Sequence, residues 1–129
     1  MKFMIKHHKG TNTAILVRKG KMPVTMLGAL NASIKKWQTI VKYLKSHKGT
    51  YVNNGDARTC ALCSINHGEC DDCPVKYYEG RYAGCWNTPY MRYVDCACNK
   101  HVKLLGIAKQ EVIFLTKVKK HWLENNASI

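Results

Sequence analysis

The most constraining feature of this chain is a pair of closely spaced cysteine motifs. Cys60 and Cys63 form one C-x2-C pair, Cys70 and Cys73 form a second, and the six residues SINHGE connect them. A C-x2-C turn places two sulfurs on one side of a tight loop, and two such turns can surround one zinc ion with Zn–S bonds of about 2.3 Å. The cysteine spacing therefore predicts a Zn²⁺ site. Because this connection is shorter than usual between zinc-binding pairs, Cys85 is a fifth candidate for the four ligand positions.

Other interpretations of the cysteines stay open. The chain has seven cysteines, an odd number that cannot all pair as disulfides within it. Their clustering, together with an N-terminal apolar run too short for a secretory signal, favours reduced thiols and a metal over disulfides. An iron–sulfur cluster is a weaker alternative, because its ligand run is denser than this one. Cys96, Cys98 and His101 offer too few ligands for a second site, and His67 is a substitute ligand in a sequence typical of an exposed turn.

Two long amphipathic helices are predicted, one on each side of the cysteine segment. In residues 23–49 and again in residues 102–125, an apolar side chain recurs every three or four positions. A proline precedes the first pattern and a glycine follows it, where helix ends are expected. The two stripes are expected to pack on each other and to form the core. They comprise Leu27, Leu30, Ile34, Trp37, Val41 and Leu44 in the first helix, and Leu105, Ala108, Val112, Leu115, Val118 and Trp122 in the second.

We expect the 129 residues to form a single α+β domain, since compact domains most often have about 100–150 residues. Two short β-type runs flank a turn with Gly and Asn and predict an N-terminal β-hairpin. The cysteine module is expected to be irregular, zinc-stabilised and treble-clef-like. Within it, Cys-Pro at 73–74 and Thr-Pro at 88–89 predict the starts of two short helices. The expected order is a basic hairpin at 1–22, a helix at 23–49, the cysteine module at 58–99 and a C-terminal helix at 102–125.

The sequence predicts neither a membrane protein nor an enzyme. No apolar run approaches the roughly 18–20 residues that span a bilayer, so we expect a cytoplasmic protein with no membrane partner. The chain has no phosphate-binding loop, paired-carboxylate motif or nucleophile elbow. No cysteine has an evident base and orienting partner. We therefore expect a binding protein without catalytic activity.

Positive charge is concentrated outside the cysteine module. Residues 60–99 carry three basic and five acidic side chains, a net charge of −2, whereas the flanks carry +15 and the whole chain +13. Such a field favours a polyanionic partner. Lysine outnumbers arginine by seventeen to four, so contacts are expected mainly with the phosphate backbone and not with bases. The candidate nucleic-acid contacts are Lys2, Lys6, Lys9, Arg18, Lys19, Lys21, Lys35, Lys36, Lys42 and Lys45.

The cysteine module also resembles a known group of proteins. The stretches TCALC at 59–63, CDDCPV at 70–75 and GCWNTPY at 84–90, followed by AKQEVIFLTKV at 108–118, resemble small proteins of tailed bacteriophages and prophages. With the tryptophan-containing helix before them, the resemblance spans roughly residues 24–120. It implies a viral accessory protein that acts on the host from within the bacterial cytoplasm, and it carries over no activity. The basic hairpin, Cys96 and Cys98 depart from the shared pattern.

Two functional hypotheses follow. The leading one is a non-enzymatic, zinc-binding phage accessory protein that contacts nucleic acid through its basic flanks. The alternative is an inhibitor or modulator that binds an acidic surface of a host protein. A nuclease accessory is disfavoured because no catalytic carboxylates are evident. The simplest interpretation of the lysines is a solvated surface with no polyanionic partner.

Overall fold

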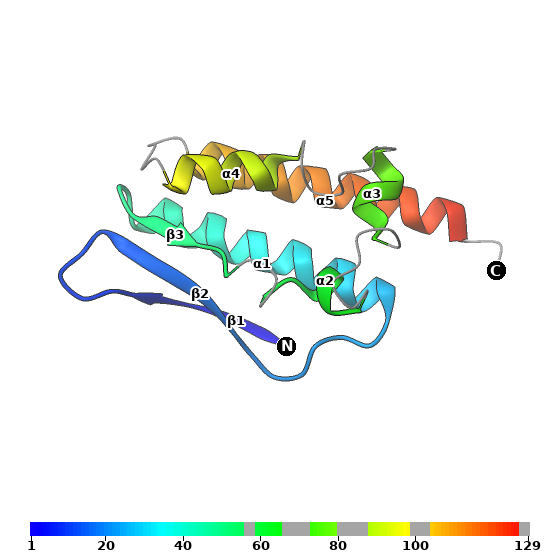
Figure 1. The fold of residues 1–129 in the computed structure, drawn as a ribbon, viewed down its shortest axis with the longest axis horizontal. Coiled ribbons are helices and arrows are strands. Elements are labelled where there is room, and N and C mark those ends of the chain that lie inside the picture. The colour runs from blue at the N-terminus through cyan, green and yellow to red at the C-terminus, as the bar shows by residue number, and fades with distance from the viewer. Residues whose placement is uncertain (56–58, 66–72, 80–87, 99–103, 127–129) are drawn as a thin grey trace.

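The computed structural model is an α+β fold in which a small sheet and two long helices surround one core (Figure 1). It describes residues 1–55, 59–65, 73–79, 88–98 and 104–126. The expected N-terminal hairpin and the expected pair of long packed helices are both confirmed. The elements are β1 (Lys2–His7), β2 (Thr13–Lys19), α1 (Met26–Ser46), β3 (Tyr51–Asn53), α2 (Ala61–Ile65), α3 (Pro74–Glu79), α4 (Pro89–Cys98) and α5 (Leu104–Asn126).

The sheet has three strands, one more than the sequence predicted. β1 and β2 form an antiparallel hairpin whose register runs from Lys2 opposite Lys19 to His7 opposite Ala14. β3 pairs in parallel with the start of β2, and its Val52 is fully buried. Because alternate strand residues point to opposite faces, Ala14 and Leu16 of β2 turn into the core while the lysines of β1 stay outside.

Helix α1 begins and ends where its sequence signals place it. The Thr25 side chain caps the helix by accepting a hydrogen bond from the Gly28 N–H at 3.0 Å. Gly49, just past the end, has a φ of 82° that favours glycine. The buried face differs from the predicted stripe, however, because Leu27 is 38% exposed whereas Lys36 is buried. The buried residues are Ala29, Leu30, Ser33, Lys36, Trp37, Ile40 and Leu44.

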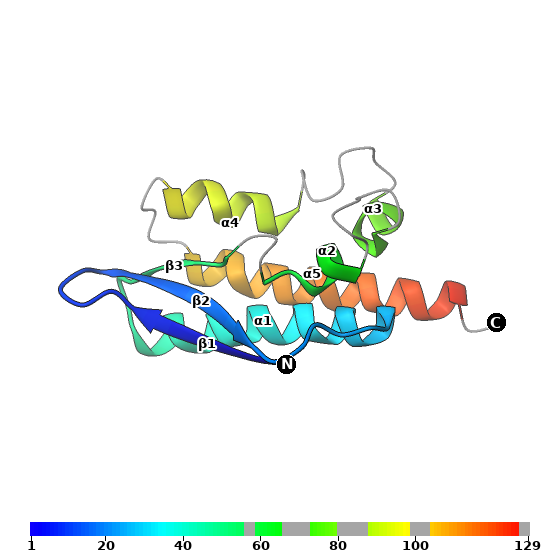
Figure 2. The ribbon, with the colours of Figure 1, turned by 60° about the horizontal axis from the view of Figure 1, so that its bottom comes forward.

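Helices α1 and α5 lie side by side in opposite directions and make the largest helix–helix interface (Figures 1 and 2). Ala108, Leu115 and Val118 of the predicted α5 stripe are buried, as expected. Trp37 is a core residue, and Trp122 packs against the core half-buried. α4 covers α5 and also contacts β3. The sequence placed the starts of α3 and α4 correctly, at Pro74 and Pro89.

An aromatic cluster attaches α4 to the rest of the core. The Trp37 ring contacts the Tyr93 ring edge-on, with 4.9 Å between centroids, and the Tyr90 ring at 6.1 Å. The hydroxyl of Tyr93 donates to the carbonyl oxygen of Val52 in β3 at 2.7 Å. Burial raises the pKa of the Tyr93 hydroxyl, so it keeps its proton and remains a donor. This one side chain therefore joins α4 to both α1 and the sheet.

Replacing Tyr93 by Phe tests this attachment. The change leaves a buried carbonyl of β3 without its donor, so we expect the free energy of unfolding to fall by about 1–2 kcal/mol. Chemical denaturation measures the loss. Tyr43→Phe is the matched control, because the Tyr43 hydroxyl bonds the exposed His7 at 3.1 Å and its removal is expected to cost under about 0.5 kcal/mol. Equal losses in the two variants would contradict the assigned role of Tyr93.

Candidate functional site

The hairpin presents lysines on the face of the sheet that points away from the core. Lys2 and Lys19 are directly opposite each other across the two strands, and both are exposed. Lys6 lies on the same face further along β1, and Lys9 lies in the turn. The remaining predicted hairpin contacts, Arg18 and Lys21, are also exposed, and the Arg18 guanidinium donates to the Gly20 carbonyl at 3.1 Å. The structure thus leaves all six predicted hairpin residues accessible to a partner.

The exposed face of α1 adds a second group of basic residues. Lys35, Lys42 and Lys45 recur at helical spacing and are all exposed, as predicted. Lys48, which the sequence analysis did not select, is exposed just beyond the end of the helix. Counting the charges over the last turn of the predicted helix would have identified Lys48.

Lys36 was predicted as a nucleic-acid contact, and this prediction is wrong. Only 2% of the residue is exposed, so its ammonium group does not reach a ligand at the surface. The ammonium donates a long hydrogen bond of 3.5 Å to Asn54 Oδ1. It also lies 5.6 Å from the Trp37 ring centre and 6.0 Å from that of Tyr90, within the range of cation–π attraction. Tertiary partners, which a helical pattern does not reveal, turn this lysine inward.

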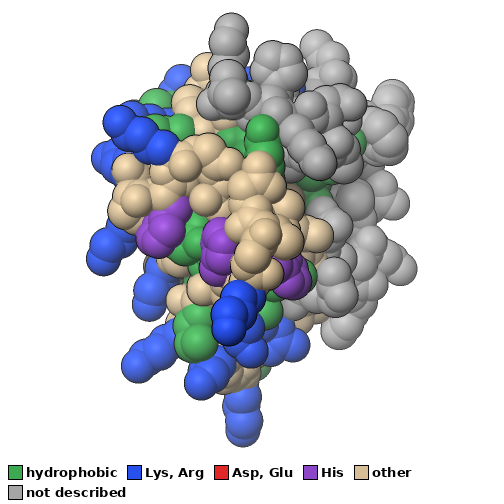
Figure 3. Space-filling view, turned by 90° about the vertical axis from the view of Figure 1, so that its left-hand side faces the viewer, with side chains coloured by type: hydrophobic (Ala, Val, Ile, Leu, Met, Phe, Trp, Pro, Cys, Tyr) green, Lys and Arg blue, Asp and Glu red, His purple; other side chains and the backbone are tan. Residues whose placement is uncertain are grey.

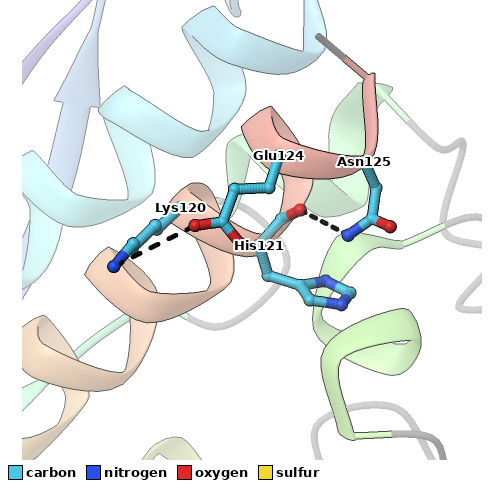
Figure 4. Close-up of polar contacts among 4 residues, drawn as sticks. All are labelled: Lys120, His121, Glu124 and Asn125. Atoms are coloured by element: carbon cyan, nitrogen blue, oxygen red, sulfur yellow. Dashed lines mark hydrogen bonds and ion pairs between the residues drawn. The ribbon is translucent and has the colours of Figure 1, made fainter. Parts of the chain in front are cut away.

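Acidic side chains hardly offset the positive charge on the described surface. Among the side chains that the structure describes, Glu111 is buried and Glu124 is the one exposed carboxylate. Glu124 lies 4.0 Å from Lys120 on the same helix, next to a hydrogen bond from Asn125 to the His121 carbonyl (Figure 4). Figure 3 shows the end of the molecule near the hairpin turn, where lysines, arginines and histidines are visible and no described acidic side chain is.

Histidines connect the hairpin to the end of α1. His7 of β1 bonds the Tyr43 hydroxyl at 3.1 Å through Nδ1 and contacts the Thr11 carbonyl at 2.6 Å through Nε2. The Tyr43 ring in turn stacks on His47 with 4.0 Å between centroids. These contacts place the hairpin turn beside the end of α1, so the two groups of basic residues are neighbours.

The described cysteines lie at the N-terminal ends of two short helices. Cys60 immediately precedes α2, and its sulfur accepts a hydrogen bond from the Cys63 N–H at 3.4 Å. A side-chain hydrogen bond from Cys63 and the nearby Lys36 charge lower the pKa of the Cys60 thiol to about 6, although burial opposes them. Cys60 therefore favours the thiolate at neutral pH, which is the form that binds metal. Cys73 is buried directly before α3.

The predicted zinc ligands are only partly within the described residues. Cys70, Cys85, His67 and His101 lie outside them, as do the side chains of Cys96 and Cys98. Within the described part of the chain, no three His, Cys, Asp or Glu side chains come close enough to hold a metal ion. Cys60, Cys63 and Cys73 therefore do not make a site by themselves, and a complete set needs ligands from outside the described residues.

A buried polar centre formed by Lys36, Asn54, Cys60 and Glu111 lies between α1, α2 and α5. The Tyr90 N–H, in the first turn of α4, donates to the Glu111 carboxylate. Glu111 thus accepts a hydrogen bond from one of the free N–H groups in the first turn of α4, a turn that has no acidic residue in its own sequence. Its Oε2 atom accepts no hydrogen bond from any residue that the structure describes. Burial raises the pKa of Glu111 to about 8, more than the Tyr90 N–H and Lys36 lower it.

Comparison with known proteins adds no relative. No protein-family model, curated protein or solved structure matches the chain. No helix in the described segments combines the length and apolarity that crossing a bilayer requires.

The raised pKa of Glu111 predicts a pH dependence of stability. Since the carboxyl pKa rises from 4.5 to about 8 on folding, the stabilisation is full below about pH 4.5 and is lost as the pH rises through about 8. Glu111→Gln stays neutral at every pH and keeps the oxygen that accepts from Tyr90. Relative to the wild type, this variant is expected to gain on the order of 2–4 kcal/mol between pH 5 and pH 8.

Denaturation at both pH values measures this difference, and subtracting the wild-type curve removes contributions that the two proteins share. Glu124→Gln is the control, because it removes the same kind of carboxylate from an exposed position on the same helix. Parallel stability curves for Glu111→Gln and the wild type would show that Glu111 has an ordinary pKa.

Proposed function

We propose that this chain is a non-enzymatic protein that binds nucleic acid through the phosphate backbone, using the exposed lysines of the hairpin and of α1. The observation that carries the proposal is the pairing of Lys2 with Lys19 on the outer face of a sheet whose described surroundings lack acidic side chains. Like charges directly opposite each other destabilise a sheet. A polyanion that binds there relieves this repulsion.

The distribution of charge supports a phosphate ligand more than it supports a plain solvated surface. Solvated surfaces usually intersperse both signs of charge, whereas this chain has 21 Lys and Arg against eight Asp and Glu, and five of those eight acids lie in residues 60–99. Lysine ammonium groups act on phosphates as point charges and read little sequence. The proposed ligand is therefore duplex or single-stranded nucleic acid of any sequence. The phage accessory role in a host cytoplasm remains part of this proposal and depends on the resemblance given above.

Salt dependence of binding tests the proposal. If five or six lysines contact duplex DNA, the logarithm of the association constant is expected to fall with the logarithm of salt concentration with a slope of about −5. Fluorescence anisotropy with unrelated duplexes and RNAs measures this slope. Changing Lys2, Lys6, Lys9 and Lys19 to Gln is expected to flatten it by roughly 3 and to weaken all sequences similarly.

The matched control changes Lys117, Lys119 and Lys120 of α5 to Gln, which removes three positive charges from the second half of α5, away from Lys42 and Lys45. This variant is expected to keep most of the wild-type slope. Equal weakening by both sets means that only net charge matters, and absence of salt-dependent binding in the wild type rejects nucleic acid as the ligand.

We further propose that the cysteine module binds one Zn²⁺ through four of Cys60, Cys63, Cys70, Cys73 and Cys85. The thiolate-favouring surroundings of Cys60 and the adjacent Cys63 thiol support this donor set. Bound zinc would cross-link the cysteine module, and we propose a structural role for it, not a catalytic one. The Lys36 charge beside Cys60 offsets part of the negative charge that several thiolates would bring together.

Metal content provides the test of the zinc proposal. Protein purified without a His-tag is expected to be colourless and to contain about one zinc per chain by elemental analysis, and EDTA is expected to lower its thermal stability. Cys60→Ser is expected to lose zinc and stability together. Cys96→Ser, outside the proposed set, is expected to keep the metal. A brown preparation indicates an iron–sulfur cluster, and an EDTA-resistant, metal-free fold rejects the site.

A further inference from the structure

A groove runs between α1 and α5 on the outside of the helix pair. Its volume is about 510 Å³, which is within the range of about 300–1,000 Å³ that is typical of ligand pockets. It lies between the second half of α1 and the first half of α5, which run antiparallel. The lining residues are Gln38, Val41, Lys42, Lys45, Lys109, Val112 and Ile113.

The floor of the groove is apolar and partly open to solvent. Val41 and Val112, which the sequence analysis assigned to the two core stripes, are only half-buried. Ile113 beside them is 56% exposed. Single exposed apolar residues are common on protein surfaces, but three branched aliphatic side chains lining one hollow form a continuous surface that a partner can cover.

Three lysines surround this apolar floor. Lys42 and Lys45 are three residues apart on α1, and Lys109 lines the groove from α5. Lysines at this spacing repel each other, and none of the three forms an ion pair with a residue that the structure describes. Their aliphatic stems can extend the apolar wall while the ammonium groups stay at the rim. The groove therefore combines an apolar floor with a positively charged edge.

We infer that this groove docks an acidic amphipathic segment of a partner protein, which would compete with the nucleic acid proposed above for Lys42 and Lys45 but not for the hairpin lysines. An apolar side chain of the segment fills the space over Val41, Val112 and Ile113, and its neighbouring carboxylates pair with the lysines. Helix-in-groove recognition has this division between apolar anchors and flanking charges.

Charge and shape disfavour the other occupants. A second copy of this chain brings a net charge of +13, which opposes association with a positively charged edge. Nucleic acid bases bind best on aromatic platforms, and no aromatic side chain lines the groove. Phosphates gain nothing from an aliphatic floor. An acidic protein segment is the ligand that satisfies both parts of the groove.

The inference is tested with a fluorescent helical peptide of about 16 residues that carries leucines on one face and glutamates on the others. Anisotropy at about 0.15 M salt is expected to show saturable binding, since this salt screens long-range attraction. A peptide of equal composition with the leucines distributed around the helix is expected to bind at least roughly tenfold more weakly. Methyl NMR signals of Val41, Val112 and Ile113 are expected to shift on binding.

Matched variants separate the groove from the general positive field. Changing Lys42, Lys45 and Lys109 to Gln is expected to weaken peptide binding roughly tenfold, whereas changing Lys2, Lys6 and Lys19 to Gln has less than about a twofold effect. Ile113→Ser is expected to weaken it roughly tenfold, and Leu123→Ser, at an exposed position outside the groove lining on the same helix, is expected not to.

Three outcomes overturn the inference. The first is absence of saturable peptide binding, and the second is equal loss in the two lysine variants. The third is binding of duplex DNA or of anionic phosphatidylglycerol vesicles that also depends on Ile113, because the groove then serves nucleic acid or lipid. Circular dichroism of each variant confirms that the fold is kept. The DNA experiment changes the same hairpin lysines together with Lys9. Failure of the peptide experiment can therefore be told apart from failure of the DNA experiment.

Discussion

The buried ammonium group of Lys36 is the constraint around which the core is arranged. Removing a charge from water costs several kcal/mol unless partners replace the lost hydration. Here Asn54 next to β3, the rings of Trp37 and Tyr90, and the nearby Cys60 and Glu111 groups provide that replacement. These partners come from every layer of the fold, so the position of α1 fixes the loop after β3 and the helices α4 and α5. Glu111, in turn, holds the first turn of α4 through the Tyr90 N–H.

The sequence predicted the elements better than it predicted which face of α1 is buried. Local signals determined the hairpin, both long helices and the proline starts of α3 and α4. Two features escaped because tertiary contacts decide them. β3 has three residues and exists through its parallel pairing with β2, which lies more than thirty residues earlier. The buried face of α1 includes Lys36, because its polar and aromatic partners outweigh the apolar periodicity there. Leu27, in the first turn, is partly exposed.

The predicted site residues are exposed, as expected, at positions where strand or helix periodicity alone determines exposure. Nine of the ten predicted basic contacts are exposed, and the exception is Lys36. The groove was not predicted, because Val41 and Val112 follow the apolar pattern of core residues but line a surface hollow. A signal for it exists in the sequence: lysines directly follow Val41 and precede Val112 within one helical turn, so the edge of each stripe is charged. The proposed zinc site needs at least one of Cys70 and Cys85, and both lie outside the described residues.

Helix α1 connects the interior charges to the proposed binding surfaces. Its inner face carries Lys36 beside the Cys60 thiol, and its outer face carries Lys35, Lys42 and Lys45. A change at the cysteines alters the negative charge that faces Lys36 and therefore acts on the helix that presents the outer lysines. The same charge faces Glu111, because the Cys60 thiolate raises the pKa of that carboxyl. If four thiolates of the module bind one zinc ion as proposed, the site carries a net negative charge, which would keep Glu111 protonated and the Lys36 ammonium charged.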